Sequence, residues 1–280
     1  MKLHFDSNQE YQLEAIKSVT DLFEGQPLNG GDFEFTMTQS GQLLTENGFG
    51  NHLKLTEDQL LANVKTIQER NEIKDRVTEL QGVNFSIEME TGTGKTYVYL
   101  RTIYELNKLY GFKKFLIVVP SVAIREGVIK NLKITHDHFQ SLYDNTSITF
   151  NVYDSKRVSN LRTYANSNAV QILVINIDSF AKDENIINKI NETGKRPIEF
   201  IQSTNPIVIV DEPQNMETEI RRKAILNLNP LCTLRYSATH TNVYNLVYSL
   251  NPVKAYDLGL VKQIEVDSVV SENAMNDAFI

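Results

Sequence analysis

Six short apolar runs constrain the fold of this 280-residue chain more than any other feature of its sequence. They alternate with amphipathic stretches, and several are nearly continuous Val, Ile and Leu. Such runs are typical of parallel strands, which helices cover on both faces of the sheet. The predicted strands are Asn84 to Glu88, Lys114 to Pro120, Ser147 to Asp154, Gln171 to Asn176, Pro206 to Asp211 and Cys232 to Ser237.

The stretches between these runs predict helices. One is expected over Ser7 to Phe23, with Ser7 or Asn8 as its N-terminal cap. Another opens at Thr56, where Thr-Glu-Asp-Gln has the capping-box form, and its apolar pattern can continue to Leu80. Between the two lies a short alternating run at residues 33–37. Later helices are predicted at Lys95 to Leu109, at Ser121 to Leu132, around Ile186 to Ile190, and at Glu217 to Leu226.

A glycine-rich turn follows the first strand, where residues 89–96 read Met-Glu-Thr-Gly-Thr-Gly-Lys-Thr. Backbone NH groups of such a turn and of the next helix point into one concavity and bind phosphate oxygens. Lys95 would reach the β- and γ-phosphates, and the Thr96 hydroxyl would ligate Mg²⁺. The turn departs from the strict motif, because Met89 replaces its first glycine. The predicted nucleotide-binding residues here are Thr91, Gly92, Thr93, Gly94, Lys95 and Thr96.

Paired acids follow the fifth predicted strand, in the sequence Asp-Glu-Pro-Gln at residues 211–214. An ATPase needs carboxylates opposite its phosphate loop. Asp211 would hold the Mg²⁺, usually through water, and Glu212 would orient or deprotonate the attacking water. The sequence therefore predicts Lys95, Asp211 and Glu212 as catalytic residues, with Thr96 and Asp211 at the metal.

A third motif, Tyr-Ser-Ala-Thr-His at residues 236–240, ends the last predicted strand. It places two small hydroxyls at the carboxyl edge of the sheet, where open α/β sheets bind ligands. The order of the three motifs resembles that of superfamily 2 helicases and DNA translocases, whose fold is two RecA-like domains with ATP between them.

Further segments narrow this resemblance. Residues 11–16, Tyr-Gln-Leu-Glu-Ala-Ile, are similar to the adenine-reading glutamine motif of the superfamily, and residues 119–127 and 176–180 resemble its strand-end segments that contact nucleic acid. Together with the phosphate loop and Asp-Glu-Pro-Gln, the sequence Pro-Ser-Val-Ala-Ile-Arg-Glu-Gly-Val at residues 120–128 resembles most the restriction (Res) subunit of type III restriction-modification enzymes.

The resemblance implies roles for residues that match the motifs of the ATP site. Gln12 would hydrogen-bond the adenine edge, with Gln9 as a less well placed alternative. Gln214 would lie near the γ-phosphate. It would signal the state of this phosphate to a second domain. Ser237 and Thr239 would couple hydrolysis to motion.

The resemblance also implies a DNA contact. Ser121 and Arg125 would touch DNA phosphate from the start of a helix, where backbone NH groups already favour anions. An ordinary surface arginine is the alternative for Arg125.

The implied fold is a RecA-like P-loop α/β domain, with a mostly parallel sheet covered by helices on both faces, preceded by a helical segment with a small insertion. Residues 1–80 would form the glutamine-motif segment and insertion, 81–255 the first RecA-like domain, and 256–280 a linker and the start of a truncated second domain. About forty residues follow Ser-Ala-Thr, fewer than the roughly 50 of the smallest usual domain. Arginine fingers contribute about 10³ to 10⁵ in turnover, so we expect ATP binding with weak hydrolysis.

Composition excludes several other classes of protein. The start of the chain lacks the apolar run of a signal peptide and no apolar stretch is long enough for a membrane span, so a cytoplasmic protein without membrane contact is expected. The single cysteine, Cys232, excludes an internal disulfide and is predicted in the core. The net charge of −7 argues against a wholly DNA-binding surface but leaves room for a local basic track. His136 and His138 are predicted in a polar loop, because no third metal ligand is near.

The predicted function is that of the N-terminal motor domain of an ATP-dependent restriction endonuclease subunit. The expected cofactors are ATP and Mg²⁺, and the expected partners are double-stranded DNA and a methyltransferase (Mod) subunit. No nuclease motif is visible in a convincing strand context. Two alternatives stay open: another superfamily 2 motor, such as a type I restriction subunit, and a nucleotide-dependent interaction module without productive turnover.

Overall fold

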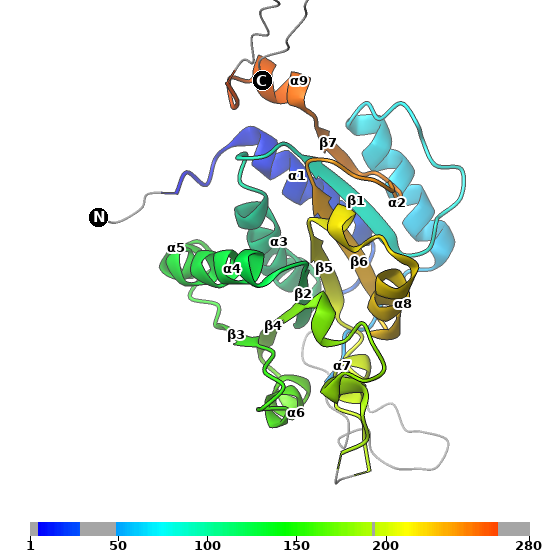
Figure 1. Ribbon diagram of the computed structural model, residues 1–280. Helices are drawn as coiled ribbons and strands as arrows, with labels where there is room; N and C mark the ends of the chain where they lie inside the picture. The colour runs from blue at the N-terminus through cyan, green and yellow to red at the C-terminus, as the bar shows by residue number, and fades with distance from the viewer. Residues whose placement is uncertain (1–4, 29–48, 192–193, 263–280) are drawn as a thin grey trace, which may run out of the picture.

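The computed structural model describes residues 5–28, 49–191 and 194–262. Its centre is a seven-stranded sheet in the order β3-β4-β2-β5-β6-β1-β7, in which every pairing is parallel (Figure 1). This arrangement confirms the predicted RecA-like α/β fold. The strands are β1 (Asn84–Met89), β2 (Lys114–Val119), β3 (Ile148–Val152), β4 (Val170–Asn176), β5 (Ile207–Asp211), β6 (Cys232–Ser237) and β7 (Tyr248–Leu250).

Side chains of the strands alternate between two apolar cores, one on each face of the sheet. Phe115, Ile117 and Val119 of β2 lie in one core, and Leu116 and Val118 lie in the other. All five side chains are inaccessible to solvent. This double burial explains why the strand sequences are continuously apolar rather than alternating.

Helices cover both faces. The first core is closed by α1 (Glu10–Thr20), α2 (Glu57–Arg70), α3 (Lys95–Tyr110), α4 (Val122–Ile134) and α5 (His136–Leu142). The second is closed by α6 (Ser159–Asn166), α7 (Ile198–Gln202) and α8 (Glu219–Asn227), while α9 (Pro252–Asp257) follows β7. No helix among the described residues is long and apolar enough to cross a membrane.

All six predicted strands are present, and each end lies within two residues of the predicted one. The seventh strand, β7, was missed because it has only three residues and pairs with β1 alone. The segment around Ile186 to Ile190 is a single 3-10 turn, Ile186–Asn188, rather than a helix.

Two predictions about helix ends were wrong. The N-cap position of the first helix is Gln9, not Ser7 or Asn8, and its side chain makes no capping hydrogen bond. The helix continues as a 3-10 turn over Asp21–Phe23 and so reaches the predicted end. The helix from Thr56 has the predicted capping box but stops at Arg70 instead of reaching Leu80.

The segment with two histidines is also not a loop, because α5 begins at His136. His138 lies within hydrogen-bonding distance of the Tyr97 hydroxyl, at 2.9 Å from its Nε2. Among the described residues, no group of three or more His, Cys, Asp or Glu could hold a metal ion. The predicted run at residues 33–37 lies outside the described residues, as do residues 263–280 of the predicted linker and start of a second domain.

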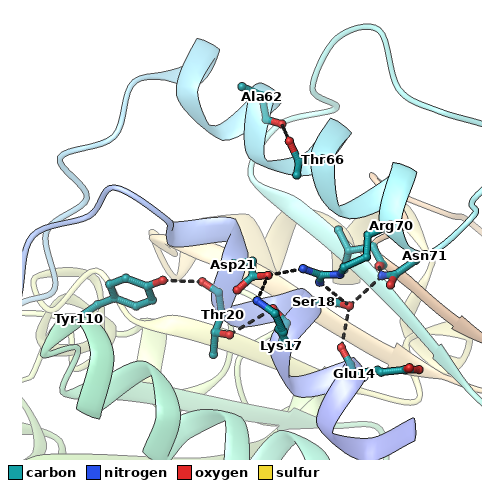
Figure 2. A network of polar contacts seen from close by, with 11 residues as sticks. Glu14, Lys17, Ser18, Thr20, Asp21, Ala62, Thr66, Arg70, Asn71 and Tyr110 are labelled. Atoms are coloured by element: carbon teal, nitrogen blue, oxygen red, sulfur yellow. Dashed lines mark hydrogen bonds and ion pairs between the residues drawn. The ribbon is translucent and has the colours of Figure 1, made fainter. Parts of the chain in front are cut away.

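Polar contacts fix the end of α1 against α2 (Figure 2). Asp21 accepts hydrogen bonds from Lys17 and Arg70. The Ser18 hydroxyl accepts a hydrogen bond of 2.8 Å from the Asn71 amide and donates one of 2.7 Å to the Glu14 carbonyl. The N-terminal helix is therefore held to the domain by its polar side as well as by its apolar face.

Asn51 joins the segment before α2 to the amino-terminal edge of the sheet. Its side chain is 3% exposed. The Nδ2 group donates to the carbonyls of Lys114 (2.8 Å) and Asn205 (3.3 Å), and Oδ1 accepts from the NH groups of Lys113 (2.9 Å) and Lys114 (3.2 Å). One amide thus satisfies four backbone groups at the start of β2 and β5.

Asn51→Ala is expected to lower the free energy of unfolding by about 2 to 4 kcal/mol, because buried backbone groups lose their partners at about 1 kcal/mol or more each. Urea unfolding followed by circular dichroism measures the change. Asn168→Ala is the control, because Asn168 is exposed and accepts a single hydrogen bond from Lys113. Equal stabilities of the two variants would contradict the proposed role of Asn51.

Candidate nucleotide site

The glycine-rich turn joins β1 to the amino terminus of α3 and requires glycine at two positions. Gly92 and Gly94 have φ of +83° and +90°, a region that residues with a Cβ rarely adopt. A Cβ on Gly94 would also lie 2.7 Å from the Nε2 of Gln12. The turn therefore delivers Lys95 at the first position of a 16-residue helix, whose free NH groups favour anions.

A chain of polar contacts connects all three sequence motifs. Lys95 Nζ lies 3.1 Å from Glu212 Oε1, and Gln214 Nε2 donates to Glu212 Oε2 at 2.6 Å. The Ser237 hydroxyl donates to Gln214 Oε1 at 2.8 Å and accepts from the NH of Thr239 at 3.0 Å. The structure therefore brings together five predicted residues that span 145 positions of sequence (95 to 239).

Asp211 lies beside this chain at the end of β5, with 5% of its surface exposed. Burial raises the pKa of its carboxyl to about 6, with the charge of Glu212 as the second cause. The Tyr99 hydroxyl donates to Asp211 Oδ2 at 3.2 Å and also contacts the Thr96 side chain. The side chains of Thr96 and Asp211 thus both contact the buried hydroxyl of Tyr99.

These two side chains fit a magnesium ion. Mg²⁺ prefers hard oxygen ligands and is held by one or two carboxylates with water and substrate phosphates. A buried carboxylate with a raised pKa gains from a nearby cation, because the cation favours its ionised form. The oxygens of Thr96 and Asp211 would hold the ion.

The loop opens onto a hollow of about 690 Å³. Its other wall comes from residues 5–12, which include Gln12. The Gln12 amide donates to the Thr93 carbonyl at 3.1 Å and to the Tyr11 hydroxyl at 3.2 Å. Gln12 is therefore beside the phosphate loop, 81 positions away in sequence. The lining residues are Phe5, Asp6, Gln9, Tyr11, Gln12, Thr91, Gly92, Gly94, Lys95, Thr96, Tyr97, Asn131 and Glu212.

Sequence reasoning missed several of these residues. Phe5, Asp6 and Asn131 carry no motif, and only their packing shows that they line the hollow. Tyr11 stands next to Gln12, so the neighbouring motif offered a signal for it. Tyr97 packs against Phe5 with ring centroids 5.8 Å apart.

The two predicted DNA-contacting residues lie elsewhere. The Ser121 hydroxyl caps α4 by accepting from the NH of Ile124 at 3.3 Å. Arg125 lies 3.0 Å from Glu126 and lines a second hollow of about 710 Å³, together with Arg157 and Ser179. Neither Ser121 nor Arg125 is among the described residues that line the phosphate-loop hollow.

Comparison with known proteins gives one family match and several relatives. The family model described as "Type III restriction enzyme, res subunit" matches residues 7–242. The EcoP15I Res subunit of Escherichia coli is 33% identical over 237 residues, which cover 76% of this chain and 24% of that protein. The EcoPI Res subunit of Escherichia phage P1 is 31% identical over 287 residues. This match covers 93% of this chain and 28% of that protein. The chain thus spans about a quarter of the length of these relatives.

Solved structures with a similar chain path include a Sulfolobus solfataricus SWI2/SNF2 ATPase core in complex with dsDNA. That structure is 16% identical, with a TM-score of 0.37 and coverage of 69% of this chain and 33% of its own. The Type ISP restriction-modification enzyme LlaGI, solved as a nuclease-deletion mutant with a DNA substrate mimic, is 14% identical. Its TM-score is 0.43, and the match covers 74% of this chain and 21% of the LlaGI chain.

Asp211→Asn is expected to stabilise the protein without ligand at pH 8. The pKa of Asp211 is raised from 3.8 to about 6, so the stability linked to this carboxyl is full below pH 3.8 and is lost as pH rises through about 6. About two pKa units correspond to roughly 3 kcal/mol, which is the upper limit of the gain. Urea unfolding measures it, and the gain should shrink toward pH 4.5.

Asp183→Asn, at an exposed position, is the control for this pH dependence. A gain in Asp211→Asn that is the same at pH 8 and pH 4.5 would show that ionisation of Asp211 is not its cause.

Proposed function

We propose that this chain, which belongs to the family of type III restriction enzyme Res subunits, is an ATP-binding motor domain that hydrolyses ATP weakly by itself. The observation that carries the proposal is the contact chain from Lys95 through Glu212 and Gln214 to Ser237 at the mouth of the phosphate-loop hollow. A triphosphate bound by this loop would compete with Glu212 for Lys95. Binding of the triphosphate would therefore break the contact between Lys95 and Glu212.

Each polar residue has a distinct task in this proposal. The turn from Thr91 to Gly94 and the start of α3 offer NH groups to the phosphates, and Lys95 adds a positive charge. Thr96 and Asp211 would hold Mg²⁺, which neutralises charge on the phosphates when bound. Gln12 would read the adenine edge from the opposite wall, with Gln9 as the alternative.

Glu212 is the proposed acceptor for the proton of the attacking water. In the structure its carboxylate is held by Lys95 on one oxygen and Gln214 on the other. Once Lys95 turns to phosphate, Oε1 of Glu212 is free to bind water, while Gln214 still holds Oε2. Because Gln214 also accepts from Ser237, a shift of Glu212 would pass to the Ser-Ala-Thr segment, where we propose that Ser237 and Thr239 couple hydrolysis to motion.

Weak hydrolysis is supported by the charge of the hollow. Among the lining residues in the described part of the chain, Lys95 is the only cation. Motors that supply an arginine to the γ-phosphate gain about 10³ to 10⁵ in turnover from it. Full activity would therefore need a cationic side chain from outside these residues.

The proposed substrate of the complete motor is double-stranded DNA, with a methyltransferase (Mod) subunit as its partner and the cytoplasm as its location. The relatives support this proposal, since they are Res subunits of type III restriction-modification enzymes. Ser121 and Arg125 are the proposed phosphate contacts. We propose movement along DNA and cleavage as activities of a complete Res subunit.

Lys95→Ala should weaken binding of ATP with Mg²⁺ by about 100-fold, because charge-assisted hydrogen bonds are worth about 1.5 to 3 kcal/mol each. Glu212→Gln should keep the affinity within a few-fold while abolishing the residual hydrolysis. Calorimetry and a phosphate-release assay measure these effects. Lys223→Ala, at a side chain 73% exposed, is the control. Unchanged affinity in Lys95→Ala would refute the phosphate role.

Arg125→Ala should weaken binding to duplex DNA of any sequence and reduce the slope of log K against log salt by about 1, as expected for loss of one phosphate contact. Fluorescence anisotropy over a salt series measures the slope. Arg196→Ala serves as the matched control, since Arg196 is half-exposed and pairs with Glu199 near α7. If both variants had the same slope of log K against log salt, Arg125 would not contact DNA phosphate.

A further inference from the structure

One wall of the phosphate-loop hollow is the short segment before α1. Phe5, Asp6 and Gln9 line the hollow from this segment, and Tyr11 and Gln12 follow from the first turn of α1. Asp6 ties the segment into a turn, because its carboxylate accepts from the NH of Asn8 at 2.9 Å and from the Gln9 amide at 2.8 Å. The position of this turn therefore sets the positions of the side chains that face the phosphate loop.

Arg101 holds this turn from α3. Its guanidinium donates to the carbonyl of Ser7 at 2.6 Å through one terminal nitrogen and to the Tyr143 hydroxyl at 3.0 Å through Nε. The Tyr143 hydroxyl donates in turn to Glu105 Oε1 at 2.6 Å. Arg101 is only 8% exposed, so these bonds form away from water and fix the guanidinium in one orientation.

The same face of α3 supplies a second contact to the segment. Tyr97, Arg101 and Glu105 are spaced four residues apart and so share one side of the helix. Phe5 stacks on Tyr97, with ring planes inclined by 16°, and its ring centroid is 5.3 Å from that of His138 on α5. The turn is thus clamped by an aromatic contact at residue 5 and by a charge-assisted hydrogen bond at residue 7.

We infer that Arg101 is a positioning residue for the base end of the nucleotide site. By holding the Ser7 carbonyl it keeps Gln9, Tyr11 and Gln12 at the distance from the phosphate loop at which the hollow accepts a purine. This inference rests on the proposed binding of ATP at this site.

The two ends of the site are separable. Arg101 is not among the described residues that line the hollow, and it donates to Ser7 and Tyr143. It also interacts with the side chain of Tyr97, which lines the hollow where Phe5 stacks on it. The phosphate end is built by residues 91–96 and Glu212, which Arg101 does not touch in any of these hydrogen bonds. Loss of Arg101 should therefore change the part of the affinity that depends on the base and spare the part that depends on phosphate.

The binding test compares ATP with inorganic tripolyphosphate, each with Mg²⁺, by calorimetry on the 280-residue chain. Arg101→Met keeps the apolar stem and removes the donors. We expect the ratio of ATP affinity to tripolyphosphate affinity to fall about 10-fold, with tripolyphosphate affinity within twofold of the original protein. Arg101→Lys, which can still donate to Ser7, should restore most of the ratio.

The matched control is Arg70→Met. Arg70 also ties the N-terminal segment to the domain, but it does so at the far end of α1 through Asp21 (Figure 2). A general loosening of α1 would lower the ratio in both variants, whereas the proposed role lowers it in Arg101→Met alone. An unchanged ratio in Arg101→Met, or an equal loss of both affinities, would overturn the inference.

A second measurement needs no nucleotide. The chain contains no tryptophan, so Phe5→Trp places a single fluorophore in the wall. Adding Arg101→Met to this variant should increase acrylamide quenching of Trp emission at least about twofold, and adding Arg70→Met should not. Unchanged quenching would overturn the inference. Increased quenching in a chain that binds neither ATP nor tripolyphosphate would support the positioning role and refute the proposed function instead.

Discussion

Parallel pairing of β5, β6 and β1 is the constraint on which the rest of this structure depends. β6 lies between the other two strands and pairs with both, so all three end at the same edge of the sheet. Each strand leads into one motif at its carboxyl end: β1 into the glycine-rich turn, β5 into Asp-Glu-Pro-Gln and β6 into Ser-Ala-Thr. The lysine of the first motif, the glutamate of the second and the serine of the third consequently meet within a chain of contacts of 2.6 to 3.1 Å.

Two features of the acidic pair at this edge of the sheet lower the stability of the protein. Asp211 is buried beside another carboxylate, which is why its pKa is raised to about 6. Glu212 has the left-handed backbone conformation, with φ of +54°, a conformation that costs about 1 to 2 kcal/mol for a residue with a side chain. A cation beside these two carboxylates would favour their ionised forms.

The sequence predicted the parts of this fold that have strong local signals. Long apolar runs revealed six strands, and the glycine-rich turn with Lys95 revealed the start of α3. It failed where the signal is short or depends on distant partners. β7 has three residues and exists because β1 offers it an unpaired edge. Likewise α5 reads as polar in sequence, yet Phe139 and His138 pack it against Tyr97.

By itself, the sequence determined six of the strands, the glycine-rich turn, the acidic pair and the order of the motifs, because each depends on neighbouring residues. Only the tertiary structure decided how the segment before α1 lies against the glycine-rich turn. Gln12 reaches Thr93, and Arg101 holds Ser7 across 94 positions, through contacts that no local pattern encodes. The physical reason is that a hydrogen bond between distant segments requires both to be placed by the packing of α1 on α3, and that packing exists only in the folded chain.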